Sequence, residues 1–253
     1  MKASMIITAL VLLTLQLSAQ EFKINKATGR LEIYEVNRVK IEGYNGSEII
    51  FSGGNDGRGQ DERAKGLRAV SSMGIEDNTG FGISAVDKGN VIEVRQLKRM
   101  GGPDLTIKVP KSVAVVIKHT SPHGSEIVVT NYDGELDIST VHNRVKLQNV
   151  TGQMNVNTVH GDVDATFDTA PKTPVNIESI HGHVDVTVPA SIKANVQLNT
   201  RFGEILVDPD LKIEIDRSGE MIRYSDKVTG KINGGGIDLM LSATHDNVYL
   251  RKK

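Results

Sequence analysis

The sequence predicts an all-β protein folded as a single-stranded parallel β-solenoid, with coils of 18–21 residues wound in a right-handed sense. Five twelve-residue segments align without gaps, and their first residues lie 18, 21, 21 and 43 positions apart. Positions one, three, ten and twelve are apolar in all five, and the residues between them are mostly polar. This period-two alternation is typical of strands that bury one face. The segments are LDISTVHNRVKL (136–147), MNVNTVHGDVDA (154–165), VNIESIHGHVDV (175–186), VQLNTRFGEILV (196–207) and LMLSATHDNVYL (239–250).

The same template also fits at half the step, in IVVTNYDGELDI (127–138) and VKLQNVTGQMNV (145–156). Each half coil of nine residues therefore combines a strand of about five residues with a four-residue corner. Proline cannot donate to a central ladder, so segments 168–174 and 189–193 belong at corners that bulge outwards. A β-sandwich of hairpins is the alternative fold, but it does not require corner residues that match from coil to coil.

The aliphatic positions of four segments form the predicted interior, because a stack of parallel strands favours such residues. They are Leu136, Ile138, Val145, Leu147, Met154, Val156, Val163, Ala165, Val175, Ile177, Val184, Val186, Val196, Leu198, Ile205 and Val207.

Residues 1–19 have the pattern of a signal peptide. Lys2 precedes an apolar stretch that ends in the small residues Ser18 and Ala19, and we expect the mature chain to begin at Gln20. The apolar stretch is short for a membrane span, and no later stretch approaches its length. We therefore expect an exported protein in the periplasm, on the cell surface or secreted, with no transmembrane segment after signal removal.

Two regions follow the signal peptide. Residues 20–104 form an N-terminal β region, with strands expected within 31–51 and at 91–96 and a glycine-rich surface loop at 52–63. Residues 105–253 form the solenoid repeat region, which we expect to be continuous with the first. After Val207, a charged segment containing three consecutive glycines interrupts the coils before the last one.

Composition excludes several classes of protein. Lysine and arginine number 30 and aspartate and glutamate 31, so there is no basic excess for nucleic acid. Aromatic residues make up only 4 %, which suits thin β-layers with many turns. The chain has no cysteine, so packing and hydrogen bonds alone must stabilise an exported protein of this kind.

One stretch carries a resemblance to a known family. LTIKVP (105–110) leads into repeated glycine-containing corners, and the chain ends in GGGIDLMLSATHDNVYLRK. This pattern resembles a bacterial exported β-strand-repeat putative adhesin family of unknown function, related to the head GIN putative adhesin domains. The resemblance implies an exported, solenoid-like protein and brings no catalytic residues with it. The final corner departs from the pattern, since Asp246 and Asn247 stand where glycine is usual.

The corners carry the repeated histidines. At position eight the segments have Asn143, Gly161, Gly182, Gly203 and Asp246, residue types that tolerate positive φ, and we expect a left-handed corner there. At position seven they have His142, His160, His181, Phe202 and His245. An imidazole ladder could bind zinc or copper, but Phe202 cannot ligate a metal. We therefore favour a stack of rings about 4.8 Å apart, one on each coil.

Position nine holds the strongest candidate for a metal site. Asp162, His183 and Glu204 would place a carboxylate, an imidazole and a carboxylate on adjacent coils, where a divalent cation could bind. Asp164 and Asp185 lie nearby at position eleven. The alternative is a solvated face on which Arg144 pairs with Asp162 across coils, and we favour it.

Two functions remain open. The first is a non-enzymatic exported scaffold or adhesin-like protein of the cell envelope, which presents a solenoid face to a protein or glycan partner and needs no cofactor. The second is a metal-dependent glycan-binding or glycan-processing protein that uses the Asp162, His183 and Glu204 strip. The serine–histidine pairs of the chain lack the nucleophile-elbow context of a hydrolase, so we expect no enzyme.

Overall fold

The computed structural model describes residues 21–53, 62–216 and 227–253. The expected signal peptide lies outside these residues, as does most of the glycine-rich loop. In the described part of the chain, no helix is both long and apolar enough to cross a membrane.

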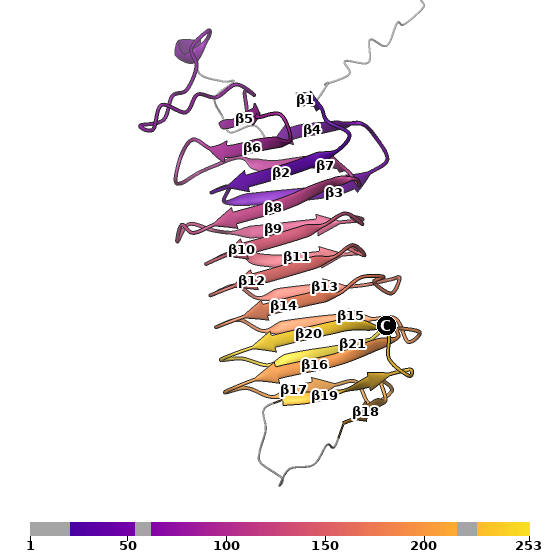
Figure 1. Ribbon diagram of the computed structural model, residues 1–253. Coiled ribbons are helices and arrows are strands. Elements are labelled where there is room, and N and C mark those ends of the chain that lie inside the picture. Colours follow the sequence, from indigo (N-terminus) through magenta and orange to yellow (C-terminus); the bar gives the residue numbers. More distant parts are fainter. Residues whose placement is uncertain (1–20, 54–61, 217–226) are drawn as a thin grey trace, which may run out of the picture.

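Almost all regular structure in the described residues is β, and it forms two stacked sheets (Figure 1). The described residues also include a short 3-10 helix, η2 (Glu62–Ala64). Sheet A has ten strands in the spatial order β1 (Glu21–Asn25), β4 (Glu48–Gly53), β7 (Asp104–Pro110), β3 (Arg38–Tyr44), β9 (Glu126–Thr130), β11 (Arg144–Gln148), β13 (Val163–Thr166), β15 (Val184–Val188), β21 (Val248–Lys252) and β17 (Ile205–Val207). Sheet B has eleven strands in the order β18 (Ile213–Ile215), β19 (Lys227–Ile232), β16 (Ala194–Thr200), β20 (Ile237–Ala243), β14 (Val175–Ser179), β12 (Met154–Thr158), β10 (Leu136–Thr140), β8 (Val113–His119), β2 (Gly29–Tyr34), β6 (Val91–Gln96) and β5 (Ile83–Asp87).

Each repeat contributes one strand to each sheet, and we call such a pair of strands a rung. The rungs stack in parallel: Leu136 of β10 lies beside Met154 of β12, which lies beside Val175 of β14. Sheet A follows the same scheme, with Val145 beside Val163 and Val163 beside Val184. The repeats are therefore not joined as antiparallel hairpins, and the predicted solenoid-like stack is confirmed over the sandwich.

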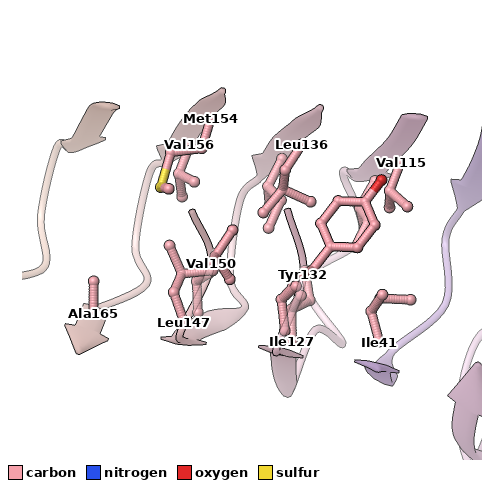
Figure 2. Close-up of a cluster of buried hydrophobic side chains, with 14 of the residues drawn as sticks. Ile41, Val115, Ile127, Tyr132, Leu136, Leu147, Val150, Met154, Val156 and Ala165 are labelled. Atoms are coloured by element: carbon pink, nitrogen blue, oxygen red, sulfur yellow. The ribbon is translucent and has the colours of Figure 1, made fainter. Parts of the chain in front are cut away.

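The interior is a single apolar core between the two sheets. Figure 2 shows Leu136 and Val156 of sheet B facing Leu147 and Ala165 of sheet A. Fourteen of the sixteen predicted interior residues are buried, and the other two, Ile205 and Val207, are half-buried at the end of the stack. Each fully buried valine, leucine or isoleucine contributes about 1.5–3 kcal/mol, so burial along the stack replaces the disulfides that the chain lacks.

The order of the rungs at the C-terminal end corrects the sequence prediction. The repeats predict that segment 196–207 stacks on segment 175–186. Instead, the rung β20–β21 lies between them: Val175 pairs with Leu239, and Leu239 pairs with Val196. All rungs share one apolar pattern and one register, so the pattern alone does not distinguish these orders.

At the N-terminal end, as at the C-terminal end, one rung lies in the stack out of its sequence order. The rung β2–β3 lies between the rungs β6–β7 and β8–β9, although it comes first in the chain. Antiparallel strands then cover both ends, namely β4, β1 and β5 at the first and β19 and β18 at the second. Strands from 20–104 and from 105–253 thus belong to the same two sheets.

Candidate functional site

A hydroxyl group fixes four of the five repeated corners between β-strands, and the fifth corner has Ala243 at this position. The Thr158 Oγ1 accepts a hydrogen bond from the Gly161 backbone N–H at 3.0 Å, and the Ser179 Oγ accepts one from Gly182 at 2.9 Å. The Ser179 hydroxyl also donates to the Gly161 carbonyl of the neighbouring rung at 3.0 Å. Short hydroxyl side chains favour such turns because they bond to backbone groups a few residues away. Each of these hydroxyls holds its own corner in a fixed position, and that of Ser179 also holds the neighbouring corner.

The corner glycines are needed for close packing, and the prediction of positive φ is wrong. Gly161, Gly182 and Gly203 are not among the residues with positive φ. A Cβ atom on Gly161 would lie 1.9 Å from the Asn143 carbonyl oxygen, and one on Gly182 would lie 2.3 Å from the Gly161 oxygen. At these glycines, neighbouring rungs approach so closely that a side chain has no room.

These corners place the position-seven rings in one row, which we call the ring ladder (His142, His160, His181, His245 and Phe202). Successive centroids lie 4.9, 4.7, 4.6 and 4.8 Å apart, with interplanar angles of 23°, 7°, 9° and 9°. The predicted stack of rings is present. Its order differs from the sequence order, because His245 lies between His181 and Phe202.

The ring ladder is exposed along its length, and 64 % of Phe202 is accessible to solvent. A metal ion bonds an imidazole nitrogen in the plane of the ring, at about 2.0–2.1 Å. Rings stacked in parallel direct their nitrogens side by side, so neighbouring histidines do not converge on one ion. Partial loss of water lowers the pKa of His181, and repulsion from His160 and His245 lowers it further.

A polar groove of about 400 Å³ opens at the His142 end of the ring ladder. It draws residues from four successive rungs, because β3, β9, β11 and β13 are neighbours in sheet A. The Arg38 guanidinium donates to Asp104 at 3.0 Å and to the Ser125 hydroxyl at 3.1 Å, and Arg144 donates to Asp162 at 3.0 Å. We call this feature the groove. Its lining includes Arg38, Ser125, His142, Arg144, His160 and Asp162.

The groove combines fixed donors, acceptors and flat rings. Both arginine side chains are about half exposed, at 53 % and 52 %, so each keeps guanidinium N–H groups that face solvent. A guanidinium offers planar, paired donors, which suit hydroxyl, carboxylate or amide oxygens on a partner. Sequence reasoning found Arg144 and Asp162 but missed the groove, because Arg38 arrives on the inserted rung β2–β3.

The structure does not place the three predicted metal ligands on adjacent rungs. Asp162 and His183 are neighbours, with the His183 Nδ1 3.2 Å from the Asp162 Oδ1. Glu204 lies two rungs from His183, because Asn247 comes between: Val184 N–H bonds to the Asn247 carbonyl, and Val248 N–H bonds to the Glu204 carbonyl. The expectation of adjacency is therefore wrong for Glu204.

His183 instead lies between two carboxylates. Its Nε2 is 2.9 Å from Asp164 Oδ1, so each ring nitrogen faces an aspartate. Asp162 is also bonded to Arg144, as the solvated-face alternative predicts. Within the described residues, no group of three histidine, aspartate or glutamate side chains has the geometry to hold a metal ion. Metal binding by Asp162 and His183 stays a prediction.

One buried histidine was not singled out from the sequence. His119 ends β8 at the position that holds Thr140 in the next rung, and it is fully buried. Its Nε2 lies 3.0 Å from the Asn37 Oδ1, while Asn37 Nδ2 donates to the Arg99 carbonyl, so His119 donates this bond. Its Nδ1 has no hydrogen-bond partner in the described part of the protein. The sequence contained one signal for this residue, namely that His119 aligns with the corner threonines, such as Thr140.

These features define a class of protein: an all-β, solenoid-like repeat of two mostly parallel sheets, with a row of rings along one corner. More specifically, the chain belongs to the Toastrack DUF4097 family, whose model matches residues 125–251. This agrees with the resemblance to a putative adhesin family of unknown function.

Comparison with curated proteins finds no match. Two solved structures are similar to the chain. A putative cell adhesion protein from Clostridium sporogenes has 15 % identity and a TM-score of 0.45, over 92 % of this chain and 99 % of that one. A putative adhesin from Bacteroides fragilis has 8 % identity and a TM-score of 0.30, over 92 % of this chain and 96 % of that one.

Proposed function

We propose that this protein is a non-enzymatic, exported scaffold or adhesin-like protein of the cell envelope, which binds a protein or glycan partner on one corner of its solenoid. The observation that carries the proposal is the ring ladder with the groove at its end. The proposal includes the right-handed winding expected for parallel strand crossovers.

Rigidity supports a role in recognition. Parallel backbone pairing fixes the ladder rings on both sides, and the hydroxyl groups of the corners fix the turns that carry them. A surface that is already ordered loses little conformational freedom when it binds, so more of the contact energy appears as affinity. The arginines beside the exposed row of rings belong to a residue type that is enriched among energetically important contact residues.

The charges of the groove also suit recognition. Arg144 is paired with Asp162 and Arg38 with Asp104, so the opposing charges hold one another in place. Exposed pairs of this kind add little stability, typically 0–1 kcal/mol. They do provide donors and acceptors at fixed positions, and hydroxyl-rich glycans and polar peptide segments need both.

Binding of the mature chain, residues 20–253, to a glycan array and to immobilised envelope proteins tests the proposal. We expect the double variant Arg144→Ala with His160→Ala to bind its partner about tenfold or more weakly, since it removes a guanidinium and a ladder ring. Arg251→Ala is the matched control, because Arg251 pairs with Asp185 at 2.8 Å on the same sheet outside the groove. No partner in either screen, or equal binding by the double variant, would overturn the proposal.

The alternative, metal-dependent glycan binding or processing, depends on Asp162, His183 and Glu204. Its test is metal analysis of the purified protein, together with the double variant Asp162→Ala and Glu204→Ala. A stoichiometric divalent ion that this variant loses would favour the alternative. We expect neither a bound ion nor a change in partner binding that depends on Glu204.

A further inference from the structure

The last rung of the chain fills a slot that the preceding residues leave open. We call β20–β21, residues 237–252, the terminal rung. In sheet B it pairs with β14 on one side and β16 on the other, and in sheet A it pairs with β15 and β17. Every one of these pairings is parallel. In both sheets, the terminal rung is the link that pairs β16 and β17 with the rest of the stack.

The slot recognises the terminal rung through features that any copy of this chain supplies. Both strands of the terminal rung are paired on both edges, and its inward side chains are at most 1 % exposed, namely Leu239, Leu241, Ala243, Val248 and Leu250. The terminal rung of a second copy offers the same backbone, the same side chains and the same register. The contacts inside the slot are therefore equivalent for a rung from either copy.

A short hinge connects the terminal rung to the rest of the fold. Strand β19 lies on one side of β16 and β20 on the other, so residues 233–236 pass across the start of β16. Three successive residues of this hinge have positive φ: Asn233 at 51°, Gly234 at 81° and Gly235 at 86°. Positive φ is unfavourable for asparagine and neutral for glycine, and an extended hinge would relax it.

The order of the strands along the chain allows a second copy to supply the terminal rung. The two rungs that border the slot precede the terminal rung in sequence, and they share its apolar pattern. The strands on both sides of the slot are therefore synthesised before the terminal rung. A nearby second copy can then supply the missing strands, as in other domain-swapped assemblies.

We propose that the terminal rung can be exchanged between two copies of this chain, so that the β20–β21 strands of each copy occupy the slot of the other. The product is a dimer joined by ordinary solenoid pairing, with the hinge extended between the two bodies. Exchange takes place while chains fold at high local concentration, because withdrawal of a seated rung exposes its five buried side chains.

Two single-cysteine chains test this proposal, and the absence of natural cysteine makes the readout clean. Asn176 of β14 and Met240 of β20 are paired across the edge of the slot, at a separation suited to a disulfide. Chains carrying Asn176→Cys and chains carrying Met240→Cys are unfolded, mixed, refolded together and oxidised. A disulfide-linked heterodimer in excess of chance contact forms where the terminal rung of one chain occupies the slot of the other.

Two controls measure chance contact. Asn155→Cys and Asn176→Cys lie on paired strands that both precede the slot, so exchange does not link them between chains. Chains mixed after separate refolding give the second control. We expect linked Asn176→Cys and Met240→Cys heterodimer well above both controls, and the fraction of chains in it should rise about tenfold for a tenfold higher chain concentration while dimers are few.

A hinge variant gives an independent measurement. Gly234→Val is strained at positive φ although nothing lies within 4 Å of the added carbon, so it should favour the extended hinge. Gly89→Val is the matched control, since Gly89 has φ of 83° and equally open space in the β5–β6 hairpin. We expect several-fold more dimer by light scattering for Gly234→Val than for Gly89→Val. Heterodimer at the control level, together with no increase for Gly234→Val, would overturn the proposal.

Discussion

At the scale of single residues, the corner glycines show how closely the backbone is packed. Neighbouring rungs bring the Asn143 carbonyl oxygen to 1.9 Å from the place where a Gly161 side chain would begin. Crowding between backbones, and not an unusual backbone angle, therefore explains why glycine recurs. The backbone atoms of a paired strand have little freedom to move away.

We predict that Gly161→Ala destabilises the protein by about 1–3 kcal/mol, because the added carbon forces two paired rungs apart. Urea unfolding followed by circular dichroism measures the change. Ser139→Ala serves as the control, since Ser139 is exposed on β10. A Gly161→Ala protein as stable as the control would show that the corner can relax.

His119 makes the stability depend on pH. Burial lowers its pKa, Glu35 opposes this with its negative charge, and His142 and His123 lower it further by repulsion. The unfolded chain then binds the proton at a higher pH than the folded protein does. Stability due to neutral His119 is thus present above the unfolded pKa, near 6.5, and is lost as the pH falls.

We predict that the free energy of unfolding decreases from about pH 6.5 to pH 5, by up to about 1.4 kcal/mol per pH unit for each proton taken up. His119→Thr, which places the threonine of the next rung here, should reduce this slope. The carboxyl groups with lowered pKa, such as Glu35, change stability only at more acidic pH. The same slope in wild type and His119→Thr would exclude His119 as its source.

At the scale of elements, the ring ladder couples neighbouring corners. Four imidazoles and one phenyl ring share the row, so the row selects flat rings and not a particular charge. We expect His160→Phe to keep the melting temperature and His160→Ala to lower it by about 2–4 °C. Differential scanning calorimetry of the two variants measures this, and equal loss in both would mean that the imidazole makes a specific contact.

The ladder and its corners could be predicted from the sequence, because parallel stacking repeats each position at each rung. Thr158, His160 and Gly161 are matched at the same spacing by Ser179, His181 and Gly182 in the next coil, and the structure places them as the alignment does. The groove could not be predicted in this way. Arg38 belongs to a rung from the start of the chain, and although NRVKI (37–41) repeats NRVKL (143–147), this repeat does not show that β9 with Ser125 lies between the two.

At the scale of the whole molecule, both chain ends provide a rung that lies inside the stack. The sequence repeats predicted a parallel solenoid-like fold and its buried residues, but they predicted the wrong neighbour for segment 175–186. The pairing energy depends on the period-two pattern, and the candidate rungs share that pattern. The order of the rungs is therefore determined by the path of the chain, which passes through β18 and β19 before it reaches β20. The same order separates Glu204 from His183 and joins Arg38 to the groove.

The order of rungs is thus the central claim, since the ring ladder and the proposed exchange both depend on it. Disulfide formation within a single monomeric chain tests it most directly. A chain with Asn176→Cys and Met240→Cys should form an internal disulfide almost completely, as read by mass spectrometry, because these residues are paired. A chain with Asn176→Cys and Gln197→Cys should remain reduced, because Met240 lies between them. A disulfide in the second chain and none in the first would contradict this order of rungs.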